Sequence, residues 1–184
     1  MKFLKHLELE GKHAILGASK YHWIRYSDDK IAEAYKKFRD IQRGTELHEL
    51  ASKLIKMKVS LPDEPKTLNM FVNDAIGYHM ESEQPLLYSP NCFGTADAIC
   101  FRNDILRVHD LKTGETKTHM EQLMIYAALF CLEYNIKPAT IRIILRIYQN
   151  DEIQELEPDV DDILHIMDRI ITADKIISSI REQE

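Results

Sequence analysis

The sequence has no run of about 20 apolar residues, the length that a membrane-spanning helix needs. Its first ten residues mix lysines and glutamates with single apolar residues, so we expect no secretory signal. Its three cysteines, Cys92, Cys100 and Cys131, are odd in number and have no paired spacing. This argues against a disulfide framework and against a four-cysteine zinc or iron–sulfur site. We therefore expect a cytoplasmic protein with no membrane partner, whose cysteines are small buried residues.

An excess of basic residues is also lacking, because the 184 residues carry a formal net charge of −6. A protein that simply binds nucleic acid usually has a basic surface. Carboxylates that hold divalent cations are offset once the metal binds, however, and charge can be segregated along a chain. Residues 151–162 are strongly acidic, whereas Lys53, Lys56 and Lys58 cluster on one short stretch. The composition therefore weighs mildly against a nucleic-acid partner without excluding one.

Neither an internal repeat nor a low-complexity linker interrupts the chain, and its length suits one compact domain. Apolar periodicity predicts helices over residues 19–38 with a break at 27–29, 44–58, a segment ending near 80, 115–134 and 158–180. Short apolar runs predict strands over residues 86–88, 94–101, 105–111, 140–148 and 153–156. Turn residues at 102–104 and 150–151 predict two hairpins. This order of elements is typical of an α/β/α sandwich with a central mixed sheet.

The residues that could form a catalytic site lie mainly on the first predicted hairpin. Asp110 and Lys112 are two residues apart on one strand, so their side chains project from the same face, while Leu111 points into the core. Asp97 lies on the neighbouring strand, and the short turn between the strands can bring it close to Asp110. The register of the two strands is left open at this point.

Two neighbouring carboxylates repel each other, and a divalent cation removes that penalty. Oxygen ligands suit Mg²⁺ or Mn²⁺, which lower the pKa of a bound water and polarise a phosphoryl oxygen. Lys112 adds a fixed positive charge that can stabilise the transition state. The alternative is an ordinary hairpin with a solvated Asp–Lys pair. The apolar flanks Ile105, Leu106 and Val108 argue against it, because they predict a buried strand in which a charged Asp110 needs a partner.

Two further features accompany the hairpin. Gln122 and Tyr126 are spaced i, i+4 and therefore share one face of the helix that follows it. His48 lies in the predicted helix over residues 44–58. Taken singly, these three are more often a surface glutamine, a core tyrosine and a hydrogen-bonded histidine than functional residues.

Taken in chain order, the residues resemble the RecB-like branch of the PD-(D/E)XK nuclease superfamily. The pattern of that branch is Gly-x-x-x-His, Gly-x-x-Asp, an acidic-x-Lys-Thr-Gly strand and Gln-x-x-x-Tyr on a helix. Here these motifs are Gly44 to His48, Gly94 to Asp97, Asp110 to Gly114, and Gln122 to Tyr126. Asp110 stands where glutamate is commoner in the branch. The resemblance implies a restriction-endonuclease-like core, with a helical part over residues 1–80, a catalytic core over 81–157 and a C-terminal helix over 158–184.

The resemblance also implies the roles of single residues. His48, Asp97, Asp110 and the Leu111 backbone carbonyl would bind one or two Mg²⁺ or Mn²⁺ ions, with Glu49 a weaker candidate ligand. Asp97 and Asp110 would form the catalytic centre with Lys112 as its lysine, and Gln122 and Tyr126 would steady it or contact the DNA backbone. The cysteines that hold an iron–sulfur cluster in some relatives are absent, so we expect no cluster.

The expected function is metal-dependent hydrolysis of DNA by a stand-alone nuclease domain, because no helicase motif or second domain is present. The small size resembles phage or prophage exonucleases used in recombination or DNA processing. An endonuclease, an RNA substrate, a recombination partner protein and a homo-oligomer stay open. The competing hypothesis is a catalytically silent module that keeps the nuclease fold and binds nucleic acid or protein.

Overall fold

The computed structural model describes residues 14–16, 18–114 and 118–183. The chain, for which we expected a single domain over residues 1–184, divides into two compact units, residues 1–45 and 46–184. The second unit contains the sheet and all the candidate site residues described below. Among the residues that the structure describes, no helix combines the length and the apolar content needed to cross a membrane.

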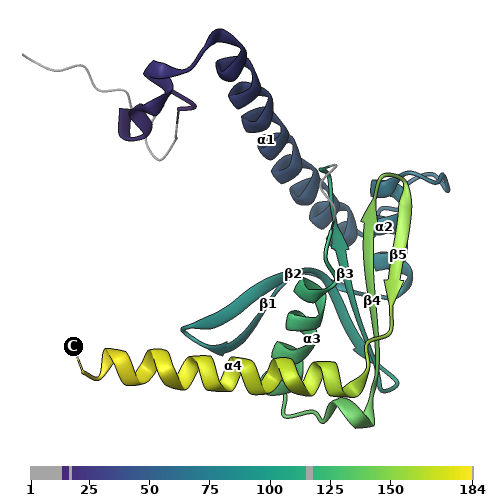
Figure 1. Ribbon diagram of the computed structural model, residues 1–184. Helices are drawn as coiled ribbons and strands as arrows, with labels where there is room; N and C mark the ends of the chain where they lie inside the picture. The colour runs from purple at the N-terminus through teal and green to yellow at the C-terminus, as the bar shows by residue number, and fades with distance from the viewer. Residues whose placement is uncertain (1–13, 17, 115–117, 184) are drawn as a thin grey trace, which may run out of the picture. The chain divides into compact units, whose positions relative to one another are not determined.

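The helices differ from the prediction mainly in the N-terminal half of the chain (Figure 1). Their bounds are η2 Ala18–Arg25, α1 Asp28–Met57, α2 Thr67–Gly77, α3 Glu121–Glu133, η3 Pro138–Thr140 and α4 Val160–Arg181. The predicted break at residues 27–29 lies where η2 ends and α1 begins, with the Ser27 hydroxyl accepting the Lys30 N–H at 3.4 Å as an N-cap. The prediction of a new helix at Gly44 was wrong, because α1 runs through this glycine. A helical glycine costs only about 1 kcal/mol, which a 30-residue helix absorbs.

Five strands form one mixed sheet in the order β1-β2-β3-β4-β5, as expected for an α/β sandwich. Only β3 and β4 run parallel, and the other neighbours are antiparallel. The strand bounds are β1 Glu81–Ser89, β2 Cys92–Arg102, β3 Ile105–Leu111, β4 Arg142–Gln149 and β5 Glu152–Leu156.

Both predicted hairpins are confirmed by their turns. Asn103 and Asp104 join β2 to β3, and Asn150 and Asp151 join β4 to β5. All four residues have positive φ angles between 51° and 60°, the conformation that a two-residue turn requires and that Asn and Asp tolerate best. The turn at Asn103 sets the register that brings the two central strands together.

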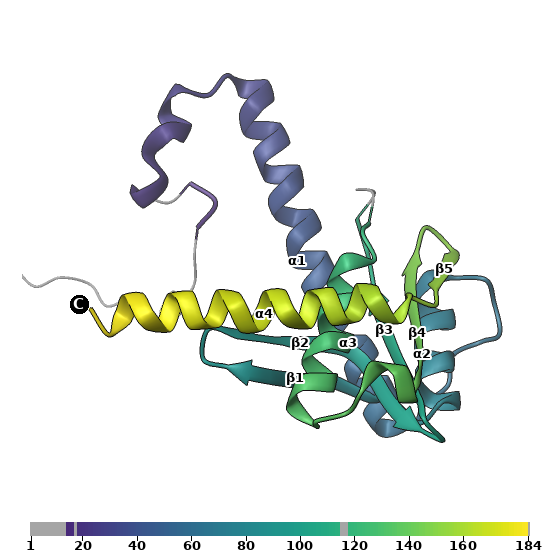
Figure 2. The same cartoon turned by 60° about the horizontal axis from the view of Figure 1, so that its bottom comes forward.

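Helices cover both faces of the sheet, and each face has its own core (Figures 1 and 2). On one face, Leu106 and Val108 of β3 pack with Leu123 and Ala127 of α3 and with Ile163 of α4. Each buried side chain of leucine size stabilises the fold by about 1.5–3 kcal/mol. These contacts hold α3 against the sheet next to the carboxyl end of β3.

The opposite face of the sheet packs against α2 and residues 46–57 of α1. Its core contains Ala51 and Ile55 of α1, Phe71 of α2, Leu111 of β3 and Tyr148 of β4. Leu111 therefore points away from the face of Leu106 and Val108, as the alternation along β3 predicted. Two layers of helices thus meet the sheet at the carboxyl end of β3, one from each side.

Candidate active site

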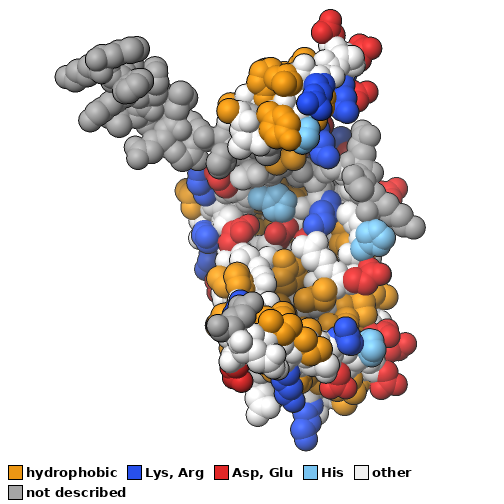
Figure 3. Space-filling view, turned by 60° about the vertical axis from the view of Figure 1, so that its left-hand side comes forward, with side chains coloured by type: hydrophobic (Ala, Val, Ile, Leu, Met, Phe, Trp, Pro, Cys, Tyr) orange, Lys and Arg blue, Asp and Glu red, His pale blue; other side chains and the backbone are white. Residues whose placement is uncertain are grey.

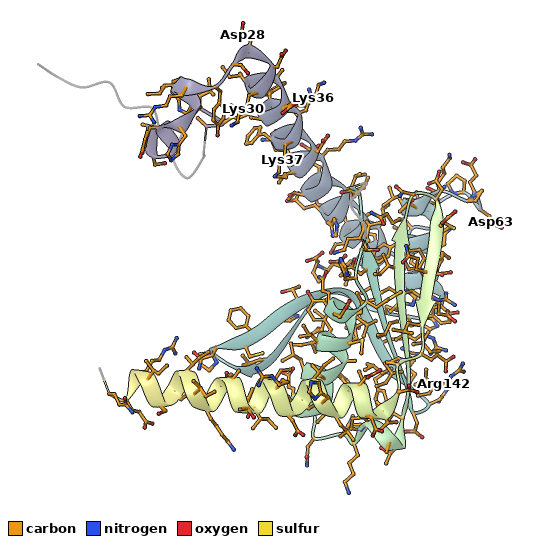
Figure 4. All side chains as sticks on the ribbon, viewed as in Figure 1. Asp28, Lys30, Lys36, Lys37, Asp63 and Arg142 are labelled. Carbon is orange, nitrogen blue, oxygen red and sulfur yellow. The ribbon has the colours of Figure 1, made fainter. Side chains whose placement is uncertain are left out.

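The site lies where β2 and β3 separate. Their backbone pairing ends at Ala98 and His109, and the next residues along the two strands are Asp97 and Asp110. The Asp97 carboxylate accepts the Leu111 N–H at 2.8 Å, so a side chain satisfies a backbone donor that β2 no longer meets. This end of the sheet is opposite the end where β4 begins at Arg142, which Figure 4 labels.

Asp110 is a buried carboxylate with an incomplete set of partners. It is 2% exposed, and its Oδ1 accepts a hydrogen bond from the Lys112 amine at 3.2 Å. The same amine lies 3.0 Å from Oδ2, but without the direction of a hydrogen bond, and Oδ2 has no hydrogen-bond partner among the described residues. Burial and the neighbouring charge of Asp97 raise the pKa of Asp110, and Lys112 opposes that shift. A cation at Oδ2 would relieve both burial and repulsion.

Lys112 connects the strands to α3. Its backbone N–H donates to the Tyr148 carbonyl at 2.9 Å, which keeps the chain extended just beyond β3. Its amine donates to Gln122 Oε1 at 2.9 Å, and the Gln122 amide donates to the Tyr126 hydroxyl at 3.3 Å. The predicted i, i+4 pair is therefore confirmed as a pair of neighbours on α3 and lies against the lysine of the strand motif.

Gly94 explains the first residue of the Gly-x-x-Asp motif. A Cβ at this position would lie 2.9 Å from Cε1 of Tyr126, closer than real Cβ contacts come. Glycine thus lets β2 approach the tyrosine ring that follows Gln122 on the helix.

His48 approaches the site from the other layer. Its Nδ1 lies 3.3 Å from Asp97 Oδ2, and this contact is the main reason why the pKa of His48 is raised. The packing of Ala51 and Ile55 in the core fixes this part of α1 beside the sheet. His48, Asp97, Asp110 and Lys112, which are scattered over the sequence, are therefore brought together.

The two weaker candidates are placed differently. Glu49 is exposed on α1, one residue and hence about 100° around the helix from His48. It does not belong to the group of potential metal-binding side chains that contains His48. The Leu111 carbonyl as a metal ligand stays a prediction.

Glu83 of β1 is a site residue that the sequence reasoning missed. Potential ligand atoms of His48, Glu83 and Asp97 all lie within 4.8 Å of one another. The first strand was expected to begin at residue 86, because Pro85 cannot donate to a strand ladder. In the structure β1 is an edge strand that tolerates the proline and extends back to Glu81.

The charges of the site are unbalanced in favour of a cation. Three carboxylates, Glu83, Asp97 and Asp110, face one lysine and one histidine. On the face shown in Figure 3, acidic side chains lie beside histidine and basic side chains in the middle of the molecule. The buried Oδ2 of Asp110 without a hydrogen-bond partner also fits a divalent ion, because carboxylate oxygens are the ligands that Mg²⁺ and Mn²⁺ prefer.

Residues 80–179, more than half of the chain, match the model of a family described as proteins of unknown function, DUF2800. The chain belongs to the DUF2800 family. No curated protein and no solved structure matches it.

The DUF2800 match covers most of the site but not all of it. Glu83, Asp97, Asp110 and Lys112 lie inside the matched range, as do both residues of the α3 pair. His48 lies before it. The part of the site that β1, β2 and β3 supply is thus within the segment that defines the family.

Proposed function

We propose that this chain is a metal-dependent nuclease that hydrolyses DNA phosphodiester bonds in the cytoplasm, as an exonuclease. The observation that carries the proposal is the meeting of Asp97, Asp110 and Lys112 at the carboxyl end of β3, with a buried carboxylate oxygen that lacks a hydrogen bond. The likeness to the RecB-like nucleases supports the same reaction, and the choice of an exonuclease rests on that likeness alone.

Each residue of the site has its own role in the proposed hydrolysis. Asp97, Asp110 and His48 hold the metal, which when bound lowers the pKa of a water molecule and polarises a phosphoryl oxygen. Lys112 places a positive charge beside the reacting phosphate, where negative charge develops in the transition state. Gln122 accepts a hydrogen bond from the Lys112 amine and so holds that amine in position, and the Tyr126 hydroxyl in turn holds Gln122.

A basic pocket next to the site supports a nucleic-acid substrate despite the net charge of −6. Lys56, Lys58, His79 and Arg102 line it, outnumbering the single carboxylate of Glu81, and Ser82, the residue before Glu83, also lies in its wall. Lys56 is close enough to lower the pKa of Glu83. Phosphates on either side of the cleaved bond could therefore meet positive charge beside an acidic metal site.

The test is incubation of the full chain with linear and with circular DNA, each with and without Mn²⁺. We expect Mn²⁺-dependent loss of linear DNA, and Lys112→Ala should reduce the rate by about 10²-fold or more. Lys175→Ala, on the exposed surface of α4, is the matched control and should leave the rate unchanged.

Each other outcome has a meaning. Cleavage of circular DNA would replace the exonuclease by an endonuclease. Binding of DNA without cleavage in Mn²⁺ or Mg²⁺ would favour the catalytically silent module. Cleavage by Lys112→Ala at the parental rate would rule out the assignment of the catalytic lysine.

A further inference from the structure

Glu83 has an unusual backbone for its place in the fold. Eight non-glycine residues in the described part of the chain have positive φ angles, and seven of them lie in hairpin turns or directly after helices. Glu83, with φ of 53°, lies inside β1. The left-handed conformation is unfavourable for an L-residue with a side chain, and such strain persists where the surrounding structure holds it.

The strained position lies across from Asp97. Ser82 and Gln84 pair with Ala98 and Ala96, so the residue between them comes opposite the aspartate without pairing to it. Its carboxylate joins those of the site, within 4.8 Å of potential ligand atoms of His48 and Asp97. The local backbone therefore places an additional acidic side chain beside an acidic site, where it is repelled unless a cation is present.

A buried hydrogen bond fixes Glu83 relative to His48. Ser52 Oγ and Ser82 Oγ are 3.0 Å apart, and both residues are buried. Ser52 is one helical turn beyond His48 on α1, and Ser82 immediately precedes Glu83 on β1. This hydrogen bond connects α1 to the edge strand β1 close to the two potential ligands, His48 and Glu83.

A second, independent observation points to a cation here. Asp110 is buried, and its Oδ2 has no hydrogen-bond partner among the described residues. Asp97 and Asp110 both follow the last paired residues of β2 and β3, and the Asp97 carboxylate accepts the N–H of Leu111, so the two aspartates lie side by side at this end of the sheet. The Lys112 amine lies 3.0 Å from Oδ2 as an ion pair, and a metal ion beside Asp97 would give this oxygen a direct ligand bond as well.

We propose that Glu83 is a metal ligand and that it joins His48, Asp97 and Asp110 in a site with one nitrogen and three carboxylate donors that selects Mn²⁺ over Mg²⁺. Imidazole suits transition-metal ions, whereas Mg²⁺ prefers an all-oxygen octahedral shell. The inference rests on the same site as the proposed nuclease but concerns which metal binds and not what the enzyme cleaves.

The first test is calorimetric titration of the metal-free full chain with Mn²⁺ and, separately, with Mg²⁺. Glu83→Gln keeps the size of the side chain and should weaken Mn²⁺ binding by about 10-fold or more, since even supporting residues of metal sites contribute that much. Glu152→Gln is the matched control, because Glu152 is an exposed glutamate on the other edge strand, β5, outside both the cluster and the basic pocket. Equal Mn²⁺ affinity of Glu83→Gln and the parent would overturn the proposal.

The nitrogen donor has its own readout. Pulsed electron paramagnetic resonance of bound Mn²⁺ should show coupling to a ¹⁴N nucleus in the parent, and His48→Ala should remove this coupling and reduce the preference for Mn²⁺. A parent spectrum without nitrogen coupling would contradict the donor set.

A second variant separates a ligand from a structural residue. Glu83→Gly removes the carboxylate and the backbone strain together, because glycine adopts positive φ without penalty. If Glu83 is held for the metal, this variant should melt roughly 2–4 °C higher than the parent without metal and bind Mn²⁺ more weakly. A lower melting temperature together with unchanged Mn²⁺ affinity would mean that Glu83 serves the fold.

The two proposals can fail separately. If Lys112→Ala abolishes cleavage while Glu83→Gln binds Mn²⁺ like the parent, the nuclease stands and the Glu83 ligand falls. If Glu83→Gln loses Mn²⁺ affinity while the parent cleaves no DNA, the metal site stands and the nuclease falls.

Discussion

Adjacent residues of β3 enter two different polar clusters on opposite faces of the sheet. Asp110 belongs to the candidate site with Asp97 and Lys112, whereas His109 belongs to a buried network under α2. In that network the Tyr148 hydroxyl donates to Asp74 at 2.6 Å and lies 3.1 Å from His109 Nδ1. Both clusters bury charge beside the same strand, yet only in the network around His109 does each carboxylate meet a guanidinium.

The network around His109 is nearly closed. The guanidinium of Arg146 pairs with Asp74 at 2.9 Å and with Glu155 at 2.6 Å, so both carboxylates of the network have a cationic partner. Tyr148 has one hydroxyl hydrogen and gives it to Asp74, so His109 Nδ1 must be the donor to Tyr148, and its Nε2 carries no proton. The Nε2 atom of His109 is then a neutral hydrogen-bond acceptor that has no partner among the described residues.

The cluster around Asp110 is open by comparison, because it leaves a carboxylate oxygen without a hydrogen bond in a surplus of negative charge. The fold gains little from this arrangement alone, because the single lysine paired with Asp110 does not balance the neighbouring carboxylates. The contrast indicates that the His109 cluster stabilises the fold, and it supports the proposal that the Asp110 cluster binds a cation. Substitutions on the two faces should therefore have opposite effects.

The largest effect is expected for Asp110→Asn. Cleavage should fall by about 10²-fold or more, because a metal-binding carboxylate is lost. The metal-free variant should nevertheless be more stable than the parent by about 1 kcal/mol, because a buried charge beside Asp97 is removed. Cleavage assays and urea unfolding without metal measure the two changes. A loss of stability in the metal-free variant would mean that Asp110 is structural.

Tyr148→Phe should show the reverse pattern. Two buried partners, Asp74 and His109, lose a hydrogen bond, so the free energy of unfolding should fall by about 1–3 kcal/mol. The Tyr148 carbonyl that holds the Lys112 backbone is unchanged, and cleavage per folded molecule should stay at the parental level. A cleavage defect as large as that of Asp110→Asn would show that the two faces are coupled.

The sequence predicts the face of the sheet that carries Asp110 more completely than the face that carries His109. The bounds of β3 were predicted as residues 105–111 and are found there, because apolar residues and a clear turn mark both strands of the hairpin. The fold class followed from the order of the elements, and the shared face of Asp110 and Lys112 followed from alternation along β3. The place of Gln122 beside Lys112 was implied by the resemblance to the RecB-like nucleases and not by spacing.

The remaining features depend on tertiary contacts that periodicity does not contain. Glu83 was missed because its strand begins before a proline and bends at a residue with positive φ, neither of which is a strand signal. The network of His109, Asp74 and Arg146 joins α2, β3 and β4 across long separations in the chain. No spacing rule connects residues that only the folded sheet brings together.

The smallest expected effect is the pH dependence of stability that the two histidines cause, and its sign differs between them. The pKa of His109 is lowered to about 3, first by burial and then by Arg146 and Arg107. The pKa of His48 is raised, chiefly by its hydrogen bond to Asp97, and the charges of Asp110 and Glu83 add to this. Below about pH 6.5 the imidazole of a histidine in the unfolded chain is protonated, whereas that of His109 in the folded protein stays neutral. Acidification should then lower stability through His109, by at most about 1.4 kcal/mol per pH unit.

His48 should act with the opposite sign, because the folded state holds its proton more tightly than the unfolded chain does. Its contribution to stability is complete below about pH 6.5 and is lost as the pH rises through the folded pKa. Urea unfolding of metal-free parent, His48→Asn and His109→Asn is measured between about pH 5 and 8, on both sides of the pKa of an unfolded histidine. The stability that His109 provides over asparagine should shrink toward low pH, and that of His48 should shrink toward high pH. If both differences change in the same direction with pH, the distinction between an open acidic cluster around Asp110 and a closed network around a neutral His109 is wrong.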